Sequence, residues 1–182
     1  YQWYRGSTAI KGATSITYVV QPADVGTALK VAVTGTKSGY VAVTRTSTAT
    51  AQVPPAALTA TPIPTITGTP TVAQTLTAGP GTWGPAPVTL AYQWYRGTTA
   101  ISNATTASYV VQPADAGTAL RVAVTGTKPG YTTVTKSSTA TAAVAKATLK
   151  GATPAIAGTR KVGATLTAGP GTWSPGEVTL SY

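Results

Sequence analysis

The feature that most constrains this chain is an internal duplication. The sequence YQWYRG at residues 1–6 returns at residues 92–97, and the ungapped alignment of residues 1–53 with 92–144 differs at 14 positions. A second block, TLTAGPGTW, ends at Trp83 and returns 90 positions later, ending at Trp173. A chain with this self-similarity is built from equivalent structural units, each about 90 residues long.

The two offsets, 91 and 90, differ by one residue, and the slip falls in the Pro-rich stretch 53–64. Linkers tolerate such length changes, so we place unit boundaries near residues 54–57 and 145–147. The predicted organisation is one complete unit at residues 54–146, the C-terminal part of a unit at residues 1–53, and the N-terminal part of another at residues 147–182.

Composition excludes several classes of chemistry. The chain has no Cys and no His, so it offers neither a disulfide framework nor the usual zinc ligands, and no Ser-His-Asp or Cys-His relay. Three acidic residues cannot form a calcium cage, and we expect no metal, no cofactor and no enzymatic activity. No apolar run approaches the roughly 20 residues of a membrane helix, so no membrane insertion is expected.

The residues favour an all-β fold. Hydrophobic residues make up 42% of the chain, with four Trp and nine Tyr, which is too much apolar surface for a disordered chain. Thr and Val are abundant, and β-branched residues suit a pleated sheet. Within residues 56–144 about seven short strands alternate with Gly- and Pro-rich turns, which is typical of a β-sandwich. We expect these residues in the core: Trp3, Leu76, Leu90, Trp94, Leu120, Val122 and Val124.

The unit resembles the immunoglobulin-like tandem repeats of secreted and cell-wall proteins of actinobacteria. The motifs are TLTAGPGTW (75–83), VTLAYQWYR (88–96), YVVQPADAGTALRVAV (109–124) and TGTKPGY (125–131). The resemblance implies an immunoglobulin-like sandwich without disulfides, with Trp94 as the core Trp of its third strand and Asp115 in an acidic turn. It also implies a role as a stalk, spacer or adhesive module.

Aromatic residues allow two interpretations. Trp94 and Trp3 would stack on sugars if exposed, but Trp94 shares its strand face with Leu90 and Tyr92, which favours the core. Trp83 and Trp173 follow a Gly-Pro-Gly break and either form carbohydrate platforms or, as we favour, fold back over the sandwich edge. The opposite face of the same strand carries the candidate contact residues Gln2, Tyr4, Gln93 and Tyr95.

Charged residues are sparse and mostly basic, giving a formal net charge of +10. Asp24 and Asp115 have no second carboxylate nearby, so we interpret each as a turn residue that accepts backbone hydrogen bonds. Basic residues recur at matched positions, including the candidate contact residues Lys37 and Lys128. A repeated basic face would suit polyanionic wall polymers or glycans, or simply a solvated surface. No recognition helix or basic-aromatic cluster points to nucleic acid.

Three functions remain open from the sequence. The first is a non-catalytic extracellular filament or stalk, supported by the tandem units and by the absence of oxidisable Cys and Met. The second is a module that attaches an enzyme or adhesin to a polyanionic cell wall or glycan. The third is an immunoglobulin-like domain of a virion tail or surface protein. We expect an extracellular or cell-surface location.

The phase of the duplication suggests one partner. Tyr1, Tyr92 and Tyr182 occupy equivalent positions, so residues 1–53 and 147–182 together contain each strand of one unit once. We therefore expect head-to-tail association with further copies, and lateral contacts through the Tyr4 and Tyr95 face. Either separate subunits exchange strands, or these residues are a window of a longer array.

Overall fold

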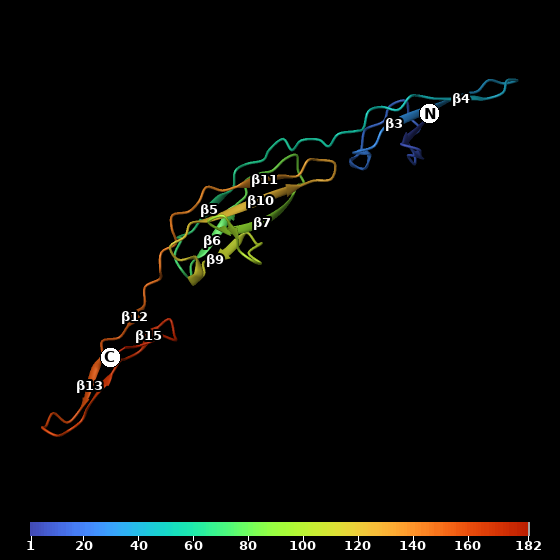
Figure 1. Ribbon diagram of the computed structural model, residues 1–182. Helices are drawn as coiled ribbons and strands as arrows, with labels where there is room; N and C mark the ends of the chain where they lie inside the picture. The colour runs from blue at the N-terminus through green and yellow to red at the C-terminus, as the bar shows by residue number, and fades with distance from the viewer. Residues whose placement is uncertain (182) are drawn as a thin grey trace.

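The computed structural model describes residues 1–181, so Tyr182 lies outside the described residues. Its regular structure consists of β-strands and two single-turn 3-10 helices, Pro22–Asp24 and Pro113–Asp115. All strand pairs are antiparallel, and they form separate sheets along an elongated molecule whose ends lie far apart (Figure 1). The prediction of an all-β fold is confirmed.

The middle unit, residues 54–146, contains seven strands in two sheets. One sheet has the order β5-β6-β9 and contains β5 (Thr65–Thr67), β6 (Thr75–Gly79) and β9 (Ser108–Val110). The other has the order β11-β10-β7-β8 and contains β7 (Thr89–Arg96), β8 (Thr99–Ala100), β10 (Leu120–Thr127) and β11 (Val134–Ser137). The two-residue strand β8 pairs with the end of β7 and forms a short hairpin with it.

The core of the middle unit lies between these two sheets. Leu76 from β6 and Trp94 from β7 are both fully buried, and the Trp94 ring stacks on Tyr109 with centroids 5.6 Å apart. Alternation along β10 turns three further residues inward, and each is fully buried: Leu120, Val122 and Val124. This arrangement is sandwich-like, with one face of each sheet hidden from water.

Two residues depart from the predicted core. Leu90 is only half-buried, and it lies opposite Gly126, the residue on which the Trp83 ring packs. Trp83 takes the buried position instead, with 5% of its surface exposed. Trp3 is also only half-buried, although its sequence surroundings match those of the fully buried Trp94.

The N-terminal segment, residues 1–53, repeats one sheet of the middle unit. Its order β2-β1-β3-β4 matches β8-β7-β10-β11, with β1 (Gln2–Arg5), β2 (Thr8–Ala9), β3 (Leu29–Gly35) and β4 (Val43–Thr46). Among the described residues, no second sheet is paired with or packed over it as β5-β6-β9 is in the middle unit. Nearly identical strand sequences thus give the same local sheet.

The C-terminal segment, residues 147–182, repeats the other part of the unit and is described to residue 181. Its two small sheets contain β12 (Lys150–Gly151), β13 (Ala155–Gly158), β14 (Leu166–Gly169) and β15 (Trp173–Ser174). The β13–β14 pair reproduces the β5–β6 pair residue for residue, with Ile156 opposite Ala168 as Ile66 is opposite Ala78. The segment lies beyond the middle unit, at the far end from β1 (Figure 1).

Candidate assembly interface

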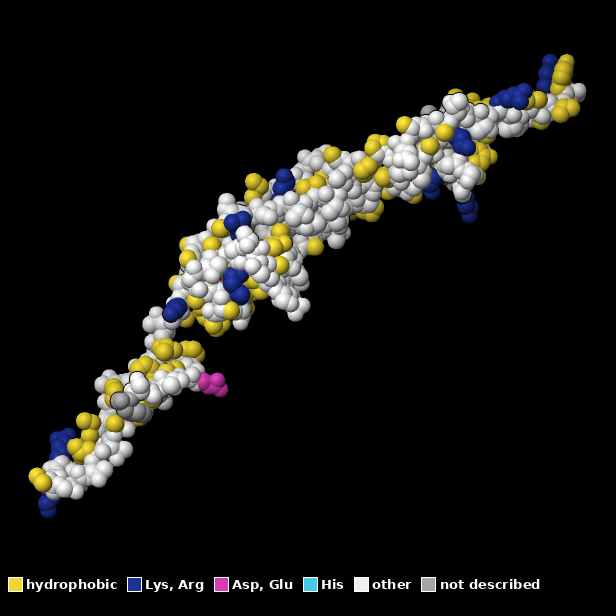
Figure 2. Space-filling model, viewed as in Figure 1, with side chains coloured by type: hydrophobic (Ala, Val, Ile, Leu, Met, Phe, Trp, Pro, Cys, Tyr) yellow, Lys and Arg dark blue, Asp and Glu magenta, His cyan; other side chains and the backbone are white. Residues whose placement is uncertain are grey.

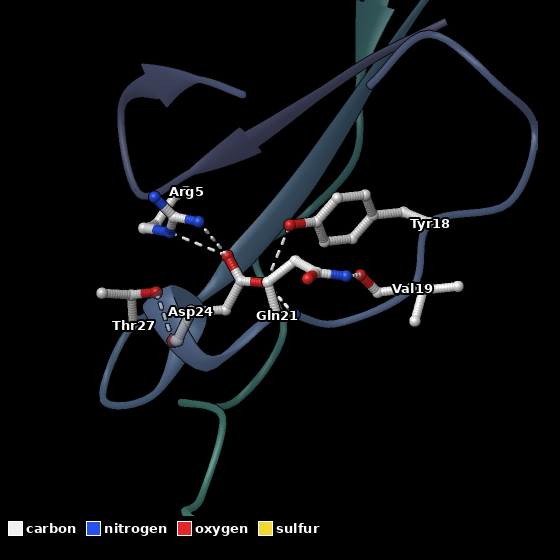
Figure 3. A network of polar contacts seen from close by, with 6 residues as sticks. All are labelled: Arg5, Tyr18, Val19, Gln21, Asp24 and Thr27. Atoms are coloured by element: carbon white, nitrogen blue, oxygen red, sulfur yellow. Dashed lines mark hydrogen bonds and ion pairs between the residues drawn. The ribbon is translucent and has the colours of Figure 1, made fainter. Parts of the chain in front are cut away.

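A buried carboxylate organises the turn at the end of each repeated sheet. Asp24 is fully buried and accepts hydrogen bonds from Arg5 Nε at 2.7 Å, Tyr18 Oη at 2.8 Å and the Gln21 backbone N–H at 2.7 Å (Figure 3). Asp115 repeats the arrangement with Arg96, Tyr109 and Gln112. Each carboxylate is thus paired and fully hydrogen-bonded, as a buried charge requires.

The environment of these groups shifts their pKa values. Burial alone raises the pKa of Asp24, but the Gln21 N–H, the Tyr18 hydroxyl and Arg5 together outweigh it and lower that pKa below its usual value. Burial, with the hydrogen bond to Asp115, raises the pKa of Tyr109 to about 12. Because its pKa is lowered, the Asp24 carboxylate stays ionised at neutral pH, and its three hydrogen-bond donors hold the turn in place.

The predicted contact residues divide into two groups. Gln93 is occupied inside its own hairpin, because its amide donates to the backbone carbonyls of Trp94 and Ile101 at 2.8 Å each. Gln2 makes the same bonds to Trp3 and Ile10. Tyr4 and Tyr95 stay half-buried, and each lines a shallow hollow on the outer face of its sheet.

The two predicted contact lysines also have different surroundings. Lys128 Nζ donates to the carbonyls of Ala86 at 3.2 Å and Pro87 at 3.1 Å, and it lies 5.4 Å from the centre of the Tyr131 ring. Lys37 lies over the Tyr40 ring at 4.8 Å. Lys128 therefore ties the loop before β7 to the loop after β10.

Basic side chains do not form one continuous patch on the face shown in Figure 2. They are spread along the length of the molecule, from one end to the other. Arg5 and Arg96 are also paired with Asp24 and Asp115 through NH2 contacts of 2.7 Å and 2.6 Å. The +10 charge is therefore distributed, and part of it is already neutralised at the turns.

The linker between the N-terminal segment and the middle unit is hydrogen-bonded at both of its ends. Val53 exchanges bonds with Gly26 and Thr27, at 2.8 and 2.9 Å. Three residues later, the Ala56 N–H donates to the Gly130 carbonyl at 2.8 Å, and the Ala56 carbonyl accepts from Thr132 at 2.8 Å. Four residues of linker are therefore fixed to both neighbours.

The same joint brings two turns into direct contact. Gly130 has a φ of +81°, and a Cβ placed on it would lie 2.9 Å from Cα of Pro22 in the first 3-10 turn. A hollow at this point is lined by apolar residues of both sides: Val20, Val25, Val53 and Tyr131. Only glycine combines this backbone angle with this close approach. We name this contact the unit joint.

Both terminal segments leave apolar residues exposed that the middle unit buries. Val33 is 41% exposed, whereas its equivalent Val124 is fully buried. Leu166 is 50% exposed, whereas its equivalent Leu76 is fully buried. Figure 2 shows hydrophobic side chains gathered on the surface of the C-terminal segment. The inner faces of these sheets have the composition of a core without the opposing sheet.

No helix within residues 1–181 is long and apolar enough to cross a membrane. The same residues contain no group of three or more Asp, Glu, His or Cys placed to hold a metal. The hollows are open surface depressions, and none brings a carboxylate together with a second titratable acid or base.

Sequence reasoning missed the two most informative features. It assigned Asp115 to a turn but did not foresee that Tyr109 and Arg96 converge on it. The signal was available, since Arg5, Tyr18 and Asp24 repeat at the same spacing as Arg96, Tyr109 and Asp115. It also gave Gly130 no role, because a glycine in a turn does not reveal which neighbour approaches it.

Comparison of the chain with models of protein families, with curated proteins and with solved structures gives no match.

Proposed function

We propose that this chain is a non-catalytic structural protein, a stiff extracellular spacer built from tandem immunoglobulin-like sandwich units. The middle unit supports this assignment through its three-stranded and four-stranded sheets, its buried Trp94 and its Tyr109–Asp115 contact. These features match the arrangement of immunoglobulin-like domains, which hold a Trp between their sheets. Fold alone does not fix function, so the proposal rests on how successive units are joined.

The unit joint is the observation that carries the proposal. A flexible tether between units would leave its backbone groups to water, whereas Val53 and Ala56 are bonded to opposite sides of the joint. The contact of Gly130 with Pro22 further fixes the angle between the two sides. A rigid joint repeated along an array gives a rod, which is the property a stalk or filament needs.

Composition supports the extracellular part of this proposal. A chain without Cys and Met presents no side chain to the common thiol and thioether oxidations. With three acidic residues and a formal net charge of +10, the chain would not be repelled by an anionic cell wall. Location outside the cell is therefore part of the same proposal.

The test compares two glycines with the same backbone angle. Gly130 and its repeat equivalent Gly39 have φ of +81° and +79°, but a Cβ on Gly39 meets nothing within 4 Å. Gly130→Ala should separate Pro22 from the turn and broaden the distribution of inter-unit distances measured by small-angle X-ray scattering. Gly39→Ala imposes the same backbone strain outside the joint and should keep the scattering profile of the unmodified chain.

The measurement is made on the full 182-residue chain, diluted until the forward scattering is independent of concentration. A single rod-like profile supports the proposal. A profile of units that move independently in the unmodified chain would contradict it. Equal broadening by both substitutions would also contradict it, because the joint contact would then have no part in stiffness.

A further inference from the structure

A hollow on the outer face of the middle unit combines an aromatic ring, a cation and two aliphatic hydroxyl groups. It lies where the end of β7, the β7–β8 turn, the start of β10 and the end of β11 meet. Tyr95 and Arg121 are directly opposite each other on β7 and β10. The residues that line the hollow are Tyr95, Gly97, Thr98, Arg121 and Ser137.

Backbone hydrogen bonds hold the walls of this hollow in place. The Gly97 N–H donates to the Ala119 carbonyl at 2.9 Å, which fixes the β7–β8 turn against the start of β10. Ser137 lies opposite Ala123 in the β10–β11 pair. The shape of the hollow therefore follows from the sheet itself. A ligand would meet a preformed surface and would lose little affinity to reorganisation of the protein.

Arg121 carries a positive charge that no acidic side chain of its own unit neutralises. Asp115 is the only acid within residues 54–146, and it is already paired with Arg96. Arg121 is exposed to solvent. The planar donors of a guanidinium suit the paired oxygens of a carboxylate or phosphate group. An acidic group on a ligand is therefore the partner that this side chain fits.

Tyr95 supplies the apolar surface of the hollow. It is half-buried, and its ring combines a flat apolar body with a polar hydroxyl. A sugar ring has the complementary form, with a face of C–H groups and a rim of hydroxyl groups. Thr98 and Ser137 are both exposed and place further hydroxyl groups beside the ring. The group of side chains thus suits a sugar that carries an acidic substituent.

The size of the hollow favours one ring of a longer chain over a whole small molecule. Its volume is about 230 Å³. Pockets that enclose a small-molecule ligand usually have about 300–1,000 Å³. A shallow hollow on an open sheet face also lets a polymer continue past the bound ring in both directions.

The internal repeat keeps the chemistry of this hollow. The five equivalent residues line a hollow on the N-terminal sheet, and Tyr4 and Gly6 are identical to Tyr95 and Gly97. The other three positions are among the 14 that differ between the repeats, and each exchange keeps a cation or a hydroxyl group. These exchanges are Ser7 with Thr98, Lys30 with Arg121, and Thr46 with Ser137.

We propose that this hollow binds one sugar ring of an anionic polysaccharide, with the ring against Tyr95 and its acidic group against Arg121. The hollow occurs once in each unit, so a linear polymer is held at intervals along the molecule. A second contact on the same chain is intramolecular and raises the affinity for a long polymer. This binding activity goes beyond the proposed function, since a stiff spacer needs no ligand.

The experiment titrates the isotope-labelled full chain and follows its amide signals by NMR. Three probes separate the sugar ring from its charge. Trigalacturonate has sugar rings with carboxylates, maltotriose has sugar rings without charge, and tricarballylate has three carboxylates without a ring. Trigalacturonate should shift the amide signals of Gly97, Arg121 and Ser137 until they saturate. The other two probes should leave these signals in place at the same concentrations.

Two substitutions remove the two parts of the site. Arg121→Gln should weaken trigalacturonate binding at this hollow about fivefold, the upper range for an exposed ion pair. Tyr95→Ala should abolish the shifts at this hollow, and Tyr95→Phe should retain them because the ring is kept. The Gly6 signal should still shift in each variant, since the equivalent hollow is intact. Lys146→Gln is the matched control, because it removes one charge at an exposed position outside the hollow.

Polygalacturonate tests whether the repeated hollows act together. It should bind the unmodified chain at least about tenfold more tightly than trigalacturonate, because one polymer contacts both hollows. Most of this gain should be lost in Tyr95→Ala, which retains one working hollow. An equal gain in Tyr95→Ala would show that the two hollows do not hold the same polymer and would reject that part of the proposal.

Three results would overturn the binding site itself. They are trigalacturonate that shifts no signal at the hollow, tricarballylate that shifts the same signals equally, and Lys146→Gln that weakens binding as much as Arg121→Gln. Absence of binding by a chain that scatters as a rod rejects the ligand and leaves the spacer function standing. Binding by a chain whose units move independently rejects the spacer and leaves the site standing.

Discussion

At the scale of single residues, the hydrogen bond from Tyr109 to Asp115 holds the 3-10 turn Pro113–Asp115 against the core. The hydroxyl donates to the carboxylate at 2.7 Å, and Tyr109 is buried. An ionised phenol at this place would face a carboxylate in a site with little water. Burial disfavours the charged phenolate and, together with the hydrogen bond to Asp115, raises the pKa of Tyr109 to about 12.

This shift predicts how stability depends on alkaline pH. The folded pKa of Tyr109 is about 12, above the unfolded value of roughly 10. Its contribution is therefore complete below pH about 10 and is lost as the pH rises through about 12. Tyr109→Phe should be less stable at neutral pH, because the buried carboxylate loses a donor, and its stability should fall less between pH 10 and 12.

The measurement is the free energy of unfolding in urea at several pH values, followed by Trp fluorescence. Tyr40→Phe is the matched control, since Tyr40 is 70% exposed. It should retain the full alkaline loss of the unmodified chain. An unchanged alkaline slope in Tyr109→Phe would contradict the assignment of this loss to Tyr109.

At the scale of elements, strand β10 shows how one glycine positions a neighbouring segment. Gly126 leaves room for the Trp83 ring on the inner face, and Val88 approaches within 3.2 Å of the Cβ position. The loop that contains Trp83 is thereby folded back against the end of the sandwich. The indole N–H donates to the Pro80 carbonyl at 2.9 Å, which fixes the ring in that orientation.

Gly126→Ala should destabilise the middle unit by about 1–3 kcal/mol, the usual range for overpacking a core. Its repeat equivalent Gly35 has only the Val43 carbonyl within reach, at 3.9 Å. Gly35→Ala should therefore leave the melting temperature unchanged. The check is thermal unfolding of both variants at equal concentration, and similar losses in the two would rule out Trp83 as the cause.

At the scale of the whole molecule, stability comes from apolar burial and from hydrogen bonds, distributed over separate sheets. The chain has no Cys, and residues 1–181 contain no cluster of metal-binding side chains. The buried apolar residues are concentrated in the middle unit, where Leu76, Trp94 and Leu120 are fully buried.

A chelator or a reductant should therefore leave the melting curve of the full chain unchanged. The test is differential scanning calorimetry with and without EDTA, and with and without dithiothreitol, at a fixed protein concentration. A shift caused by EDTA would reveal a metal site and contradict this account of stability.

Much of the fold could be predicted from local information. Repetition defined the unit, β-branched residues indicated strands, and alternation along residues 120–124 placed Leu120, Val122 and Val124 inward. Trp94 was predicted inside because its neighbours on the same face are apolar. The surroundings of the candidate contact residues were less predictable, since the sequence did not reveal that the Gln2 and Gln93 amides bond within their own hairpins. Their use at a contact surface stays a prediction.

The sequence by itself determined the repeat, the strand class and the face that each strand residue occupies, because these depend on neighbours along the chain. Only the tertiary structure decided which of those faces are buried. Val33 and Val124 occupy equivalent positions and have the same neighbours along the chain. Val33 is 41% exposed whereas Val124 is fully buried, because burial requires an opposing sheet. Leu90 and the Gly130–Pro22 contact show the same principle, since each depends on a residue that is distant in sequence and close in space.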